Sequence, residues 1–284
     1  MNKFVDDKLL ISMSMDFSVL MSVYIKEQPA YLDEALRSIF EQTLPPDEVV
    51  VVKDGLLTDE LEQVLNSYEK EKGNLKIVSL PDNVGLGKAL HIGMGYCKNE
   101  IIARMDSDDI CKSNRFEVQI NFMKSHPEIS VVGTWVEEFS ESKDQIESVR
   151  QLPLEHEKLL KFMKWRNPFN HMTVMFRKKD VECVGGYQPF YLLEDYYLWN
   201  RMANGGFQFA NIGESLLWAR GGYEMLKRRG GGRYVVSEYH LLNFMRESGR
   251  INLCEFVFSL SVKSVVRLIG KRGRALLYRT FLRK

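Results

Sequence analysis

Glu48-Val-Val-Val-Val-Lys-Asp-Gly55 is the segment of this 284-residue chain that says most about its architecture. Four consecutive valines are typical of a strand buried on both faces, as strands are in a parallel sheet covered by helices. Asp54-Gly55 is a turn signal, so we expect the strand to end at Lys53. The segment therefore predicts a strand of a parallel, helix-covered sheet.

The sequence around this strand alternates between strand and helix patterns. We expect further strands at 18–24, 75–80 and 100–105, and helices at 31–42, 58–70 and 88–97. In the first helix, Leu32, Ala35, Leu36 and Ile39 fall at helical spacing. The alternation predicts an α/β fold with a doubly wound, mostly parallel sheet that is flanked by helices.

The second half of the chain carries weaker signals. We expect helices at 115–126 and 195–203, strands at 129–136 and 170–177, and a surface hairpin or loop at 137–150. We divide the chain into an α/β domain over residues 1–220 and a C-terminal segment over residues 221–284.

Polar side chains follow three of the expected strands. Tyr24, Asp54 and Asp106 each end or follow one. In α/β sheets of this kind, ligands bind beyond the carboxyl ends of the strands. We therefore expect these three residues to gather at one edge of the sheet.

Asp106-Ser-Asp-Asp109 places three carboxylates within four residues at the end of a strand. Like charges this close repel one another, and a hard cation such as Mg²⁺ or Mn²⁺ offsets the repulsion and also binds phosphate oxygens. The alternative is a turn followed by a helix N-cap, since aspartate favours both. The place of the segment after a buried strand favours the metal site.

An ordered set of segments resembles glycosyltransferase family 2, whose fold is GT-A. The set comprises Val19-Leu-Met-Ser-Val-Tyr24, Leu36-Arg-Ser-Ile-Phe-Glu-Gln-Thr43, Val49-Val-Val-Val-Lys-Asp-Gly55, Asn83-Val-Gly85 and Asp106-Ser-Asp-Asp109, and then Asn167-Pro-Phe-Asn-His171 and Glu194-Asp195. Within the family, the chain is similar to bacterial transferases of exopolysaccharide and O-antigen assembly, of the amylovoran type.

The resemblance implies roles for the residues at the sheet edge. Ser22 and Tyr24 match residues that hold the nucleobase, and Asp54 matches the acid that bonds the uracil ring. Asp106 matches the residue near the ribose or the metal, and Asp108 matches the metal ligand. We therefore expect Asp106 and Asp108 to bind the metal ion of a UDP-sugar complex.

Four other residues have two interpretations each. Lys53 stands where the family more often has a second aspartate, and it either touches the nucleotide or is exposed. Asp109 serves the metal or caps the next helix. Lys88, at a helix start, suits a diphosphate but is also a plausible surface lysine. His171 resembles part of an acceptor-side loop, although a lone histidine is more often structural.

Glu194-Asp195 is a second carboxylate centre. An inverting transfer needs a base that takes the proton from the acceptor hydroxyl as that oxygen attacks the anomeric carbon. The resemblance places this base at Asp195 and makes Glu194 its catalytic partner. The alternative is that the pair only caps a helix. A metal ion would neutralise the leaving UDP.

A basic, glycine-rich stretch follows residue 219. It consists of Arg220-Gly-Gly-Tyr223 and Lys227-Arg-Arg-Gly-Gly-Gly-Arg233. Its cations suit a pyrophosphate, so we expect Arg220 to bind the donor and the stretch to close over it; a flexible linker is the alternative.

The C-terminal segment is strongly basic, with eight Lys or Arg residues and no acid from Phe256 to Lys284. A helical wheel places Phe258, Val262, Val265 and Ile269 on one face and Lys263, Arg267, Lys271 and Arg274 on the other. Such a helix is typical of proteins that bind an anionic membrane surface. The alternative is a helix packed on the catalytic domain with its basic face in water.

Composition limits the remaining possibilities. A net charge of +1 argues against a nucleic-acid partner. The four cysteines show no CxxC spacing, which argues against a zinc site or a redox pair. The first 16 residues do not resemble a signal peptide, and no long apolar run predicts a membrane span. We therefore expect a cytoplasmic protein, peripheral on the inner face of the plasma membrane.

Together these features predict an inverting, metal-dependent transferase. It would move one hexose from a UDP-sugar to a polyprenyl-diphosphate-linked saccharide in surface-polysaccharide synthesis. The Gln-x-x-Arg-Trp sequence of processive synthases is absent, which favours addition of a single sugar.

Two alternatives stay open. A sugar-phosphate nucleotidyltransferase would carry a glycine-rich loop where residues 24–31 have no glycine. A non-catalytic, membrane-associated binding module of the same fold would not need both Asp108 and Asp195.

Overall fold

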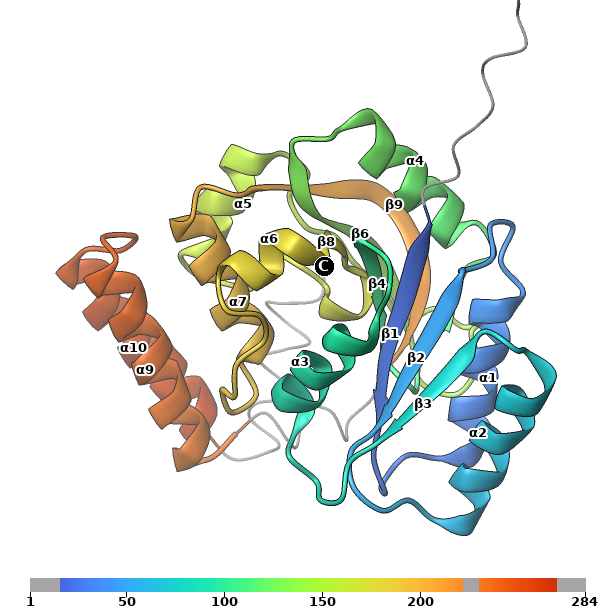
Figure 1. The fold of residues 1–284 in the computed structure, drawn as a ribbon. Coiled ribbons are helices and arrows are strands. Elements are labelled where there is room, and N and C mark those ends of the chain that lie inside the picture. The colour runs from blue at the N-terminus through green and yellow to red at the C-terminus, as the bar shows by residue number, and fades with distance from the viewer. Residues whose placement is uncertain (1–15, 222–229, 270–284) are drawn as a thin grey trace, which may run out of the picture.

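The computed structural model describes residues 16–221 and 230–269, and these build one mixed sheet with helices on both faces (Figure 1). The strands are β1 (Phe17–Val23), β2 (Glu48–Lys53), β3 (Leu75–Ser79), β4 (Ile101–Met105), β5 (Ile110–Cys111), β6 (Ile129–Phe139), β7 (Ser148–Arg150), β8 (Met175–Arg177) and β9 (Gln208–Arg220). The helices are α1 (Pro29–Phe40), α2 (Asp59–Glu71), α3 (Leu86–Tyr96), α4 (Arg115–Ser125), α5 (His156–Met163), α6 (Lys178–Cys183), α7 (Glu194–Asn204), α9 (Gly232–Glu247) and α10 (Leu253–Leu268).

The first half of the sheet is parallel and follows the order β3-β2-β1-β4. The four strands lie where the sequence predicts them. All four valines of β2 are fully buried, because helices cover both faces of the sheet. The fold predicted from these segments is confirmed.

The second half of the sheet is mixed. Strand β8 runs antiparallel between β4 and β6, and the long strand β9 pairs in parallel with β6. The hairpin expected at 137–150 is present as the β6–β7 pair. The strand expected at 170–177 is shorter, because a 3-10 turn at His171–Thr173 precedes β8.

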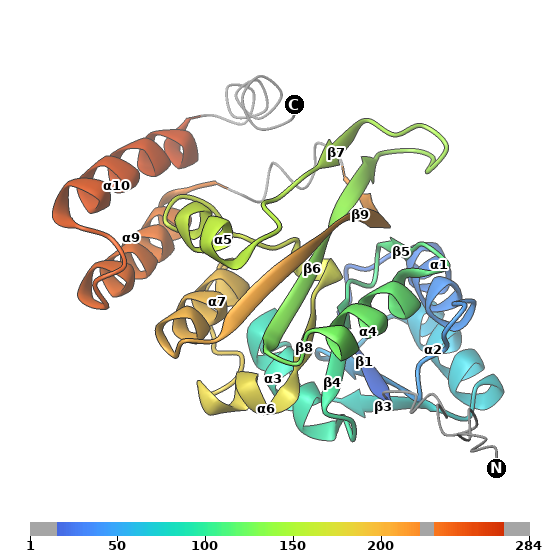
Figure 2. The same cartoon turned by 90° about the horizontal axis from the view of Figure 1, so that it is seen from above.

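Two apolar layers sandwich the sheet. On one face, α1, α2 and α4 bury Leu36, Leu61 and Phe116. On the other face, α3 and α7 bury Leu90 and Trp199 (Figure 2). This arrangement fixes the starts of α3 and α7 beside the carboxyl ends of the parallel strands.

Helices α9 and α10 pack against each other at the end of the molecule away from α1 and α2 (Figure 2). The amphipathic helix predicted from the wheel is present as α10. Its basic face, however, points neither to a membrane surface nor to water, the two directions that the sequence suggested. Lys263 and Arg267 point inward, where each forms an ion pair with the buried Glu238 of α9. Neither cation is therefore free for a lipid headgroup.

Parts of the predicted basic regions lie outside the described residues. These are Lys271, Arg274 and residues 222–229 of the glycine-rich stretch. Within the described ranges, no helix combines the length and the hydropathy that a bilayer crossing requires.

Candidate active site

Tyr24, Asp54 and Asp106 lie at one edge of the sheet, as predicted. Each residue directly follows its strand, and the strands β2, β1 and β4 are parallel neighbours. Ser22 is the penultimate residue of β1, two positions before Tyr24. It is paired with Val52 of β2.

Asp54 organises the loop between β3 and α3. Its Oδ1 accepts the backbone N–H of Val84 at 2.7 Å, and its Oδ2 accepts that of Gly85 at 3.0 Å. Gly85 has φ +86°, a conformation that glycine adopts without strain. Both carboxylate oxygens of Asp54 thus hold the start of α3 against the sheet edge.

Two lysines near this edge of the sheet, Lys53 and Lys88, differ in where their ammonium groups are directed. Lys53 forms an ion pair with Glu62 of α2, so its ammonium group is directed to that helix. Lys88 is exposed in the first turn of α3, beside backbone N–H groups that have no partner within the helix. Of the two, Lys88 is placed to meet an anion.

Asp106, Asp108 and Asp109 bring carboxylate oxygens within 4.8 Å of one another. Burial raises the pKa of Asp108 to about 7, and the charges of Asp106 and Glu27 add to the effect. A cluster of oxygen ligands with this repulsion is the environment that a hard divalent cation stabilises. The cluster fits a Mn²⁺ or Mg²⁺ ion.

Glu27, from the loop between β1 and α1, was not singled out by the sequence pattern. Its carboxylate accepts a hydrogen bond from the Ser107 hydroxyl, and its charge helps to raise the pKa of Asp108. A fourth carboxylate therefore borders the cluster. It ties the loop after β1 to the loop after β4.

Asp109 anchors the cluster to β9. The residue is buried, and its Oδ1 accepts the backbone N–H of Arg220 at 2.7 Å. The prediction that Asp109 caps the next helix is wrong, because Asn114 holds the N-cap position of α4. Its other oxygen, Oδ2, has no hydrogen-bond partner among the described residues.

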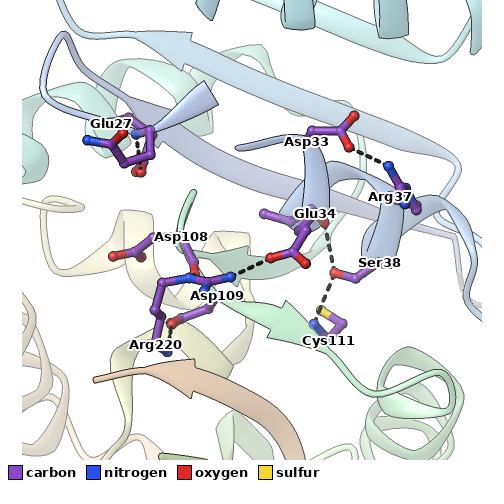
Figure 3. Close-up of polar contacts among 11 residues, drawn as sticks. Glu27, Asp33, Glu34, Arg37, Ser38, Asp108, Asp109, Cys111 and Arg220 are labelled. Atoms are coloured by element: carbon purple, nitrogen blue, oxygen red, sulfur yellow. Dashed lines mark hydrogen bonds and ion pairs between the residues drawn. The ribbon is translucent and has the colours of Figure 1, made fainter. Parts of the chain in front are cut away.

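Arg220 clamps the aspartate segment from the end of β9 (Figure 3). Its Nε donates to the Asp108 carbonyl at 3.0 Å, and its guanidinium pairs with Glu34 of α1. The guanidinium also stacks on the Tyr31 ring at 3.8 Å. These contacts hold Arg220 beside the cluster, while its contact with a donor stays a prediction.

Glu194 and Asp195 open helix α7, as predicted. Asn167 Nδ2 donates to Asp195 Oδ2 at 2.6 Å, and His171 Nδ1 lies 4.0 Å from the same oxygen. His171 Nε2 in turn lies 2.8 Å from the Tyr187 hydroxyl. Asn167 thus orients Asp195, and His171 lies next to it.

Burial sets the protonation of this second centre. It lowers the pKa of His171 well below its ordinary value, which keeps the imidazole neutral. Burial, followed by the charge of Asp195, raises the pKa of Glu194 to about 7. Two adjacent carboxylates here share an environment in which one is readily protonated.

Arg104 pairs with the first carboxylate centre, and sequence patterns did not identify it. It is 1% exposed in β4, and its guanidinium pairs with the Asp106 carboxylate. Its charge also opposes the rise in the pKa of Glu194. Its Nε and Nη1 have no hydrogen-bond partner within the described part of the chain. The sequence feature that could have identified Arg104 is a charged residue within a strand that is otherwise apolar.

Comparisons with known proteins agree with this geometry. The model of the family described as "Glycosyl transferase family 2" matches residues 18–185. The chain is 37% identical over 268 residues to UDP-Gal:alpha-D-GlcNAc-diphosphoundecaprenol beta-1,3-galactosyltransferase of Escherichia coli, covering 94% of this chain and 97% of that protein. It is 38% identical over 262 residues to the amylovoran biosynthesis glycosyltransferase AmsE of Erwinia amylovora, with coverage of 92% and 97%.

A solved structure shows the same fold. The crystal structure of S. aureus TarS 1-349 in complex with UDP-GlcNAc aligns with a TM-score of 0.64 at 19% identity, covering 89% of this chain and 72% of that one. The predicted GT-A architecture is therefore confirmed. With a family model that spans more than half of its length and relatives that align almost end to end, the chain belongs to glycosyltransferase family 2.

Proposed function

We propose that this chain is an inverting, metal-dependent glycosyltransferase. It transfers one hexose from a UDP-sugar to a polyprenyl-diphosphate-linked saccharide in bacterial surface-polysaccharide synthesis. The observation that carries the proposal is the presence of two carboxylate centres, Asp106 to Asp109 and Glu194-Asp195. The buried Arg104 pairs with Asp106 of the first centre, and its charge also acts on Glu194 of the second.

The first centre binds the donor. Asp106 and Asp108 hold Mn²⁺ or Mg²⁺, and the ion supplies charge neutralisation for the leaving diphosphate. Ser22, Tyr24 and Asp54 border the nucleoside, and Lys88 at the start of α3 faces the phosphates. Support comes from the all-oxygen ligand set and from the pKa of Asp108, which burial and then the neighbouring carboxylates raise.

The second centre performs the proton transfer. Asp195 takes the proton from the acceptor hydroxyl as that oxygen forms its bond to the anomeric carbon, and the bond to the UDP oxygen breaks on the opposite face. Asn167 holds the Asp195 carboxylate by a hydrogen bond, and the neutral His171 lies beside it. Attack from the face opposite the leaving group inverts the anomeric configuration.

The acceptor and the location rest on the relatives. The Escherichia coli protein acts on a diphosphoundecaprenol-linked sugar, and such a lipid resides in a membrane. We therefore place this chain at the inner face of the plasma membrane, in contact with an anionic lipid surface.

A donor screen tests the function. The full chain is incubated with Mn²⁺, a panel of UDP-hexoses and a short-chain polyprenyl-diphosphate-linked N-acetylhexosamine. We expect UDP release with one donor and, by NMR, a product with the opposite anomeric configuration. A product that keeps the donor's configuration overturns the mechanism. Pyrophosphate release from UTP and a sugar phosphate instead indicates a nucleotidyltransferase.

Metal binding should stabilise the fold more as pH rises. The pKa of Asp108 is 3.8 in an ordinary environment and about 7 in the fold, so the unfolded chain loses this proton first. Without metal, stability therefore falls between about pH 4 and pH 7. Mn²⁺ binds the deprotonated cluster and restores that stability above pH 7.

Thermal melts with excess EDTA or excess MnCl₂ check this expectation. The increase in Tm caused by Mn²⁺ should be small at about pH 5 and largest at about pH 8. Asp108→Asn serves as the matched control, since it removes the titrating group, and it should flatten the dependence. An equal increase at both pH values contradicts the prediction.

A further inference from the structure

Helix α10 presents an outward face without a single charged side chain. Its exposed residues are Leu253, Cys254, Val257, Phe258, Ser261, Val262, Val265 and Leu268. The six Leu, Val and Phe residues among them are each at least 47% exposed. Their spacing of three and four residues makes one continuous strip along a helix about 24 Å long.

The charged residues of α10 all face the protein. Glu255 pairs with Lys164 at 2.9 Å, and Lys263 and Arg267 each pair with Glu238 at 2.8 Å. Burial alone would raise the pKa of Glu238, but the two cations hold it below its ordinary value. Rotating α10 to expose them would leave a buried, unpaired carboxylate, which is strongly unfavourable. The apolar strip therefore stays outward.

The charge of the adjoining sequence indicates what covers this strip. Residues 270–284, which continue from the end of α10, contain six Lys or Arg and no acid. A sequence of this charge is attracted to an anionic lipid surface. Figure 2 shows α10 beside α9 at the outer edge of the molecule.

We propose that the apolar face of α10 inserts into the interfacial layer of an anionic bilayer. Phe258, Val262, Val265 and Leu268 lie among the acyl chains near the headgroups, and the basic sequence that follows α10 favours an anionic surface over a neutral one. The face of α10 that contacts the membrane is therefore the apolar face, opposite to the face that carries Lys263 and Arg267. The inference rests on the proposed function in that a polyprenyl-linked acceptor requires the enzyme at a membrane.

Vesicle flotation with the full-length chain tests the proposal. The vesicles are phosphatidylcholine alone, or phosphatidylcholine with phosphatidylglycerol. Val265→Asp/Leu268→Asp places two charges on the strip, where both side chains are more than half exposed, so folding should be retained. We expect this variant to lose at least about tenfold in partitioning onto the anionic vesicles. The matched control, Ile146→Asp in the β6–β7 hairpin, should float like the wild type.

Two results overturn the proposal. One is flotation of the double variant that equals the wild type. The other is a wild-type chain that does not float but self-associates in sedimentation velocity, with the self-association lost in the double variant. That result would make the strip an interface between copies of the chain. UDP release with a detergent-dissolved acceptor separates this question from the proposed function. If the chain floats as expected but transfers no sugar, the membrane-binding proposal is supported and the proposed transferase function is wrong.

Discussion

Asp195→Asn should lower kcat for sugar transfer by about 10³-fold and leave KM for the UDP-sugar nearly unchanged. The asparagine keeps the size of the side chain but cannot accept the proton of the acceptor hydroxyl. In the function that we propose, the donor is held mainly at the other centre, by Asp106, Asp108 and the start of α3. UDP release and transfer to a lipid-linked acceptor, measured at several donor concentrations, give both constants.

Two variants frame this result. Asn167→Ala keeps the base but removes its 2.6 Å hydrogen bond, so kcat should fall by only about tenfold. Asp144→Asn, in the exposed β6–β7 hairpin, is the matched control and should leave both constants unchanged. Full activity in Asp195→Asn removes this residue as the base and directs attention to Glu194.

Asp108→Asn should abolish most of the metal-dependent activity. Loss of one carboxylate weakens binding of the cation, and the cation contributes several kcal/mol to stabilising the developing charge on UDP. We expect kcat/KM to fall by about 10³-fold and the Mn²⁺ concentration for half-maximal activity to rise. Calorimetric titration of UDP in the presence of Mn²⁺ measures the binding loss separately.

The control for this variant is Asp59→Asn, an exposed aspartate in the first turn of α2. It changes the net charge equally and should leave metal dependence intact. If Asp108→Asn keeps its response to Mn²⁺, the ligand set is a different one, and Asp106 with Asp109 becomes the next pair to test.

Local sequence was sufficient to predict the first half of the fold. The valines of β2 and the alternating segments up to Asp106 fixed four parallel strands and the edge where Tyr24 and Asp54 lie. Strand β9 escaped notice, since Gln208–Arg220 mixes buried and exposed positions without a regular period. Its pairing with β6 is a tertiary effect that no local pattern reports.

The site was predicted in outline but not in its connections. Arg220 holds Asp109 across 111 residues, and Ser107 meets Glu27 across 80. Such contacts depend on the complete fold, so residue type and spacing could not indicate them. The helical wheel of α10 likewise separated two faces correctly, yet only the partner carboxylate of Glu238 decides which one points inward.

Gly87 has a wider consequence for the donor site that we propose. A Cβ at this position would lie 3.0 Å from the Cβ of Glu194, so the absence of a side chain lets the first turns of α3 and α7 lie back to back. Each helix start carries a partial positive charge of about half an elementary unit from its aligned peptide dipoles. The pocket thus has a backbone-derived field that favours a dianionic leaving group. Substitutions that leave Gly87 unchanged keep this field in place, whereas a side chain at Gly87 would push the two helix starts apart.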